Sequence, residues 1–191
     1  MQRLILASAS PRRKMLLEQM GCRDFIIRPA PGPEPEAGDL PPDEAVVAVA
    51  LAKGQAVAAG AAPGDLILAA DTEVYFGGTL LGKPQDEAGA REMLARLSGQ
   101  KHTVYTGVAL FLDGRVVTGV EATDVFFDTI TPEDIAAYVA SGEPMDKAGA
   151  YGLQGRAAAF IRRIEGDVYN VIGLPLNKLA ALAREMGVGL F

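Results

Sequence analysis

The feature that most constrains the fold is a pair of long β-rich segments, residues 102–112 and 115–127, separated only by Asp113-Gly114. A two-residue connection of this type favours a tight hairpin turn, because both central positions need positive φ angles that Asp and Gly tolerate. The two segments therefore predict a long antiparallel hairpin.

Short apolar runs and helical segments alternate through the rest of the chain. Ser10 followed by Pro11 predicts a capped helix start. Strands are expected over Leu4–Ala7, Phe25–Ile27, Leu66–Ala70 and 157–164, and helices over 11–20, 43–59, 86–97 and 175–186 and from Thr131 onward. These signals predict an α/β fold with a mixed sheet flanked by helices. Without repeats or a linker, residues 1–191 are expected to form a single domain.

Composition excludes several classes of function. The net charge of −6 argues against binding a nucleic-acid polymer, although a local basic cluster with a bound cation can hold a small polyanion. The single cysteine, Cys22, excludes a disulfide framework, and the single histidine, His102, excludes a multi-histidine metal site. No apolar run reaches the roughly 18 residues of a membrane span. With no signal-peptide pattern, a cytoplasmic location is expected.

One cluster of polar residues follows the first expected strand and contains Ser8, Ser10, Arg12 and Arg13. Backbone N–H groups at a helix start favour an anion there. Two arginines in the first turn oppose the helix dipole, which costs stability unless an anion compensates. The segment is therefore either a triphosphate cradle contacted by Ser8 and Arg13, or a capped helix with two exposed arginines.

A second cluster, Asp71-Thr72, ends the expected strand Leu66–Ala70. In α/β proteins ligands gather beyond the carboxyl ends of strands. A carboxylate there can bind Mg²⁺ or accept a proton from water, although an ordinary aspartate with a pKa of about 3.9 is a weak base. The alternative interpretation is an aspartate that caps a turn.

Two lysines and one glycine-rich segment complete the candidates. Lys83 follows Gly82 and offers a point charge for phosphate, and Lys53 lies within an alanine-rich helix. Either lysine is also compatible with a solvated surface. The segment 143–155 carries Gln154, whose amide both donates and accepts and so suits the edge of a nucleobase.

Taken together, these clusters resemble the Maf family of nucleoside triphosphate pyrophosphatases, also described as septum-formation inhibitors. The matching motifs, in family order over nearly the whole chain, are ASASPRRKMLL, ALAKGQA, LAADTEV with LGKPQD, LSGQKHTVYTGVAL, SGEPMDKAGAYGLQG and IEGDVYNVIGLPL. The resemblance implies a mixed α/β fold related to the inosine-triphosphatase group, with an elongated central sheet and two lobes around a cleft. It also implies cleavage between the α- and β-phosphates, a divalent cation (Mg²⁺ or Mn²⁺), and it allows a homodimer.

The resemblance also implies roles for individual residues. Asp71 matches the family's proposed proton acceptor and a metal ligand. The phosphate-contacting positions match Ser8, Arg13, Lys53 and Lys83, and the substrate-choice positions match Arg12, Thr72 and Gln154. A further metal ligand is expected in the proline-rich loop 29–42, where Glu34 is the best match and Glu36 the alternative.

The resulting expectation is an enzyme that hydrolyses dTTP and UTP, or modified pyrimidine nucleotides, to the monophosphate and pyrophosphate. Two other classes stay open: a nucleotide-binding regulator of cell division without catalysis, and a purine-directed house-cleaning triphosphatase. His102 is expected to be structural and Cys22 a small buried hydrophobe. Thr103 and Thr106 are further candidates to face the cleft.

Overall fold

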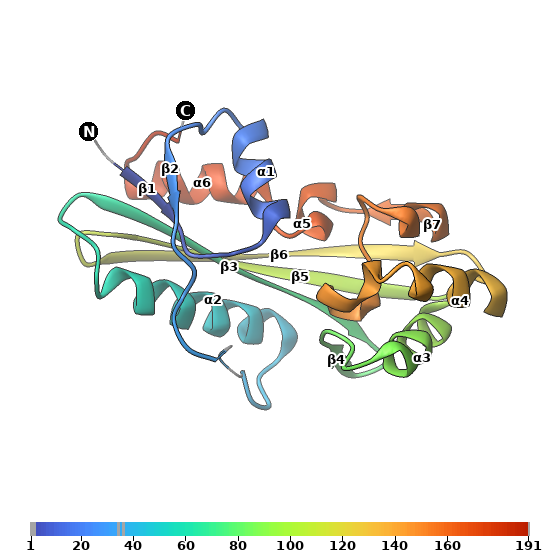
Figure 1. Ribbon diagram of the computed structural model, residues 1–191. Coiled ribbons are helices and arrows are strands. Elements are labelled where there is room, and N and C mark those ends of the chain that lie inside the picture. The colour runs from blue at the N-terminus through green and yellow to red at the C-terminus, as the bar shows by residue number, and fades with distance from the viewer. Residues whose placement is uncertain (1–2, 34, 36, 191) are drawn as a thin grey trace. The chain divides into compact units, whose positions relative to one another are not determined.

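The computed structural model describes residues 3–33, 35 and 37–190 (Figure 1). Its sheet has the strand order β2-β1-β3-β5-β6-β7, and β4 pairs with β3. The strands are β1 (Arg3–Leu6), β2 (Phe25–Ile27), β3 (Asp65–Phe76), β4 (Thr79–Leu81), β5 (Lys101–Leu112), β6 (Arg115–Phe127) and β7 (Ile161–Glu165). The helices are α1 (Pro11–Gln19), α2 (Pro42–Ala58), α3 (Glu87–Leu97), α4 (Pro132–Ala140), α5 (Val168–Ile172) and α6 (Leu176–Met186). Three short 3₁₀ turns, Glu143–Asp146, Ala148–Ala150 and Arg156–Phe160, lie between α4 and β7.

The sheet is mixed, as the sequence predicts. Strand β1 runs parallel to both β2 and β3, whereas β4 is antiparallel to β3 and β7 is antiparallel to β6. Strands β5 and β6 are joined at Asp113 and Gly114, whose φ angles of 46° and 81° are those a two-residue hairpin turn requires. The expected hairpin is confirmed.

The chain divides into two compact units, which correspond in number to the two lobes expected from the resemblance. The first unit comprises residues 1–72, 106–121 and 173–191, and the second comprises residues 73–105 and 122–172. Strands β3, β5 and β6 each contribute residues to both units. That residues 1–191 form a single domain stays a prediction.

In the first unit, α2 covers one face of the strands, and α1 and α6 lie over the other (Figure 1). Two glycines let α2 approach β5 closely. A Cβ at Gly107 of β5 would lie 2.4 Å from the backbone of Val46, and a Cβ at Gly54 of α2 would lie 2.1 Å from the Phe111 ring. At Gly107 the helix backbone therefore lies directly on the strand, and at Gly54 the absence of a side chain leaves room for the Phe111 ring.

The second unit has its own apolar core, which α3 and α4 help to form, and these two helices contact each other. His102 lies within this core, as expected of a structural residue. Its ring packs edge-on against Phe127 and Tyr151, and its Nε2 atom lies 2.7 Å from the Tyr151 hydroxyl. Cys22, in the first unit, is also buried as expected, with an exposed fraction of 5%. Among the residues that the structure describes, no helix has both the length and the hydropathy needed to cross a bilayer.

Three local expectations are wrong or incomplete. Residues 157–160 form a 3₁₀ turn instead of a strand, because the run of three alanines has weak β-propensity and follows a glycine turn; β7 begins only at Ile161. Strand β3 continues past Thr72 to Phe76, where β4 pairs with it, so Asp71 and Thr72 lie within the strand instead of at its end. The sequence patterns do not predict helix α5.

Candidate functional site

Alternation along β3 places the Asp71 side chain toward α2. Ile67 and Ala69 of β3 pack against Ala50 of α2, and Asp71, two residues farther on, faces the same side of the sheet. Lys53 lies one turn beyond Ala50 on the same face of the helix. Its Nζ atom is 2.7 Å from Asp71 Oδ1, and the two side chains are only 13% and 8% exposed. The fold therefore forms a largely buried ion pair from two residues that the sequence singled out separately.

Thr72 faces the opposite side of the sheet, where α1 supplies Arg13. The Arg13 guanidinium donates from Nη2 to Thr72 Oγ1 at 3.1 Å, from Nη1 to Ser8 Oγ at 3.1 Å and from Nε to the Gly173 carbonyl at 2.9 Å. These bonds run in three directions and hold the plane of the guanidinium. Ser8, Arg13 and Thr72 are thus brought together, on segments far apart in the sequence.

The start of α1 has the capped geometry that the sequence predicts. Ser10 has an extended backbone, and its side chain accepts a hydrogen bond from the Arg13 backbone N–H. The Ser8 hydroxyl accepts another from the Ser10 backbone N–H at 3.2 Å. Arg12, in the first turn, is partly buried. The alternative of two exposed arginines is wrong for Arg13, because its side chain is half-buried and hydrogen-bonded.

Thr106 is a residue whose role the sequence placed incorrectly. Its side chain is fully buried and therefore does not face a cleft. Its hydroxyl lies 2.9 Å from the Thr72 hydroxyl and helps to fix the orientation of that group. Alternation along the strand places Thr106 on the same face as Val104, and in the structure both residues are buried. Thr103, the other candidate, donates to a carboxylate on β6.

Strand β1 ends close to Asp71 and Thr72 of β3. The pairing of β1 with β3 ends at Leu68, three residues before Asp71, and the loop of residues 7–10 continues from there into α1. Lys53 reaches this part of β3 from one face of the sheet, and Arg13 reaches it from the other. An anion at this end of β1 would meet Arg13, the hydroxyl-bearing loop, the start of a helix, and Lys53 together with the Asp71 carboxylate that is paired with it.

Two further predicted residues, Lys83 and Gln154, lie in the second unit. Lys83 is exposed and follows β4. Gln154 is exposed within a turn whose ends are joined by a 3.2 Å hydrogen bond from the Gly155 N–H to the Gly152 carbonyl. Both side chains have polar interactions within the protein.

The predicted metal ligands Glu34 and Glu36 lie outside the described residues. Within the described part of the chain, no group of three His, Cys, Asp or Glu side chains is arranged to hold a metal ion. Asp71 nevertheless suits Mg²⁺ or Mn²⁺, because its ligand atoms are hard oxygens. Mg²⁺ is commonly held by one or two carboxylates together with substrate phosphates, so a full protein cage is not required.

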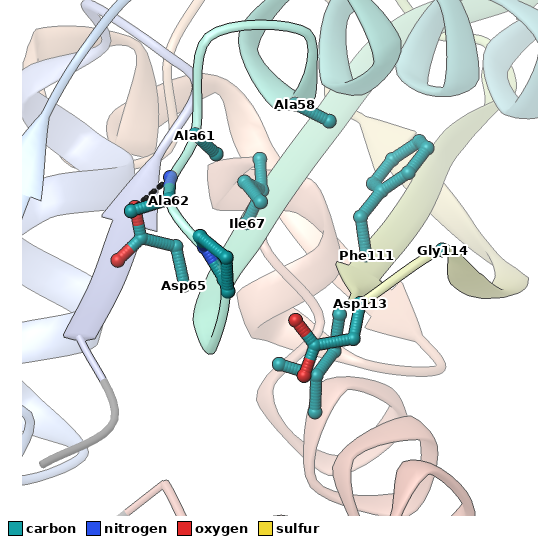
Figure 2. Close-up of a pocket in the computed structure, with 10 residues that line it drawn as sticks. Ala58, Ala61, Ala62, Asp65, Ile67, Phe111, Asp113 and Gly114 are labelled. Atoms are coloured by element: carbon teal, nitrogen blue, oxygen red, sulfur yellow. Dashed lines mark hydrogen bonds between the residues drawn. The ribbon is translucent and has the colours of Figure 1, made fainter.

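The first unit also has a pocket of about 290 Å³ beside the start of β3, shown in Figure 2. Asp65 borders it, six residues before Asp71, or roughly 20 Å along the strand. The Arg3 side chain and the Ala62 backbone N–H hydrogen-bond to the Asp65 carboxylate and lower its pKa. The residues that line the pocket include none of the predicted site residues that the structure describes, so it is separate from the Asp71 region.

The sequence is similar to known proteins over nearly its whole length. A family model described as Maf-like protein matches residues 3–186. A protein of Moorella thermoacetica is 52% identical over 98% of this chain and 97% of its own length. A protein of Symbiobacterium thermophilum is 48% identical over 100% and 97%, and one of Methanosarcina mazei is 44% identical over 100% and 98%. All three carry the name dTTP/UTP pyrophosphatase.

Solved structures support the fold at low sequence identity. A HAM1 protein from Coxiella burnetii is 16% identical, with a TM-score of 0.54 and coverage of 97% of this chain and 100% of that one. The Ham1 protein of Staphylococcus aureus is 11% identical, with a TM-score of 0.52 and coverage of 96% and 99%. At these identities the likeness concerns the fold alone, and it agrees with the mixed α/β architecture.

Proposed function

Because the chain belongs to the Maf-like protein family, we propose that it hydrolyses nucleoside triphosphates, dTTP and UTP in particular, to the nucleoside monophosphate and pyrophosphate. The names of relatives 44–52% identical over nearly the whole chain support this substrate class. The structural observation that carries the proposal is the largely buried ion pair between Lys53 of α2 and Asp71 of β3, with Arg13 hydrogen-bonded to the neighbouring Thr72. A carboxylate and fixed cations at one strand edge suit hydrolysis at a phosphate.

In the proposed reaction, a water molecule attacks the α-phosphorus. The bond from that phosphorus to the oxygen bridging the α- and β-phosphates breaks, and pyrophosphate leaves with the bond's electrons. Asp71 accepts the proton that the water loses. The 2.7 Å contact with Lys53 orients the Asp71 carboxylate and keeps a positive charge beside it.

Positioned positive charge is expected to supply most of the rate enhancement, as in other phosphoryl transfers. Arg13 cannot swing away easily, because three hydrogen bonds hold its guanidinium before any ligand arrives. Ser8 lies against it and presents a hydroxyl. Lys53 and Lys83 are proposed as the other phosphate contacts.

A divalent cation is part of the proposal. Asp71, and Glu34 by the resemblance in sequence, would hold it. When bound, such a cation neutralises charge on the phosphates and lowers the pKa of a bound water.

Choice of nucleobase is assigned to Arg12, Thr72 and Gln154. The Thr72 hydroxyl is held between Arg13 and Thr106, so its orientation is set before a ligand arrives. The Gln154 amide can pair with the carbonyl and N–H groups of a pyrimidine edge. A site that hydrogen-bonds its ligand rejects mismatched edges strongly, because its own polar groups would be left unpaired.

The test combines one substitution with a panel of substrates. Asp71→Asn keeps the side-chain shape and should reduce turnover of dTTP by about 100-fold or more, the usual contribution of a positioned proton acceptor. Binding of a non-hydrolysable dTTP analogue should persist, and Asp43→Asn, at an exposed carboxylate on α2, should behave like the unaltered protein. Near-normal turnover by Asp71→Asn would refute the role of Asp71.

The panel contains dTTP, UTP, CTP, ITP and 7-methyl-GTP, each with Mg²⁺, with Mn²⁺ and with a chelator. Release of pyrophosphate is expected for dTTP and UTP and should stop with the chelator. Preference for ITP or 7-methyl-GTP would overturn the pyrimidine assignment. Release of orthophosphate instead of pyrophosphate would overturn the proposed bond of cleavage.

A further inference from the structure

Gln154 lies at the centre of a short turn in the second unit. The turn runs from Gly152 to Gly155, and the hydrogen bond between these two residues leaves Leu153 and Gln154 at its tip. The 3₁₀ segment Arg156–Phe160 follows directly. The backbone position from which Gln154 projects therefore depends on what holds the two glycines at the ends of the turn.

The side chain of Glu143 holds the Gly155 end. Its carboxylate oxygens accept the Arg156 backbone N–H at 3.1 and 3.2 Å, and Oε1 also accepts the Tyr138 hydroxyl at 3.1 Å. A Cβ at Gly155 would lie 1.8 Å from Glu143 Oε1. Only a glycine at this position leaves room for the carboxylate to reach the Arg156 backbone.

The Lys147 side chain, from the same segment, packs against the Gly152 end. A Cβ at Gly152 would lie 2.7 Å from Lys147 Cε, so the lysine stem passes directly against the turn. The Lys147 ammonium donates to the Glu143 carbonyl at 2.5 Å and to Asp146 Oδ1 at 2.6 Å. Both ends of the turn therefore rest on residues 143–147.

Tyr138 of α4 anchors this arrangement to the core of the second unit. Its side chain is 3% exposed. Burial, and then the charge of Glu143, raise the pKa of the Tyr138 hydroxyl, while a backbone hydrogen bond with Gly152 acts in the opposite direction. The hydroxyl stays protonated near neutral pH and so remains a donor to Glu143.

We propose that Glu143 is a positioning residue that holds the turn displaying Gln154 and thereby sharpens the choice of nucleobase. This inference rests on the proposed function, in which Gln154 contacts the base. Without the carboxylate, the turn samples more conformations, and binding must restrict them again. The loss should therefore appear in KM and in base preference, with kcat little changed.

The test is a double-mutant cycle between Glu143→Ala and Gln154→Ala, read with dTTP and ITP. Glu143→Ala should raise KM for dTTP about tenfold, the equivalent of one well-placed hydrogen bond, and should reduce the preference for dTTP over ITP. Gly155→Ala should act in the same direction by displacing the carboxylate, and Glu143→Gln should retain part of the wild-type preference. Glu92→Ala, at an exposed position on α3, is the matched control and should change neither quantity.

If Glu143 acts through Gln154, the double variant should have the same KM for dTTP and the same base preference as Gln154→Ala alone. Fully additive losses, or unchanged base preference in a folded Glu143→Ala protein, would overturn the proposal. If Glu143→Ala does not fold, Gly155→Ala or Glu143→Gln replaces it in the double-mutant cycle with Gln154→Ala. Hydrogen exchange of the Arg156 amide then measures whether the turn has become more mobile. If the unaltered protein releases no pyrophosphate, the proposed function fails, and the cycle read by dTTP affinity decides the positioning role separately.

Discussion

His102 should make the protein lose stability in mild acid. The imidazole is 1% exposed between two aromatic rings, and burial lowers its pKa from 6.5 to about 4, although the charge of Asp124 acts in the opposite direction. The unfolded chain, in which the pKa is near 6.5, therefore takes up this proton at a higher pH than the folded chain does. The contribution of His102 should be constant above pH 7 and should be lost as the pH drops from about 6.5 to about 4.

The magnitude follows from the two pKa values. Their difference, 6.5 − 4, is about 2.5 units, and at about 1.36 kcal/mol per unit the full effect approaches roughly 3.4 kcal/mol below pH 4. Between pH 7 and pH 5 the linkage relation predicts a loss of about 2 kcal/mol. Urea unfolding followed by circular dichroism at pH 7, 6 and 5 measures it, with His102→Gln in parallel.

The comparison rests on the slopes with pH, because His102→Gln also disturbs the Tyr151 contact at every pH. Free carboxylates titrate near pH 4, so most of their effect falls below the measured window. The unaltered protein should lose about 2 kcal/mol more than the variant between pH 7 and pH 5. Parallel curves for the two proteins would refute the reasoning.

Two further predictions concern the first unit. Gly107→Ala should lower the free energy of unfolding, measured by urea titration, by about 1–3 kcal/mol, because the new methyl group would meet the Val46 backbone, which cannot move aside. The control Gly60→Ala adds its methyl group in open space and should leave the free energy of unfolding nearly unchanged. Cys22 should react slowly with iodoacetamide in the folded protein and rapidly in urea, because burial shields its thiol and raises its pKa. Mass spectrometry over time measures this; equal rates in both conditions would contradict it.

Features set by neighbouring residues were predictable from the sequence. The Asp113-Gly114 turn has the positive φ angles that its residue types favour, and Ser10 caps α1 because its hydroxyl reaches the amide three residues on. The order of most strands and helices was also predictable from the sequence. So was the family resemblance, because it depends only on motifs and their spacing. Residues 157–160 show the limit, because an alanine run has little local preference and the preceding turn decides its conformation.

Contacts between distant segments were decided only by the tertiary structure. Lys53 meets Asp71 because close packing of α2 on the sheet brings that helix face over β3, and Arg13 reaches the carbonyl of Gly173, 160 residues away. Glu143 meets the Arg156 backbone across a glycine turn, and the local sequence, although it marks the segment as functional, does not specify this contact. Such pairings depend on strand register and on how closely helices approach the sheet, which are properties of the assembled core. A residue's type states what chemistry it can perform, but packing selects the partner with which it performs it.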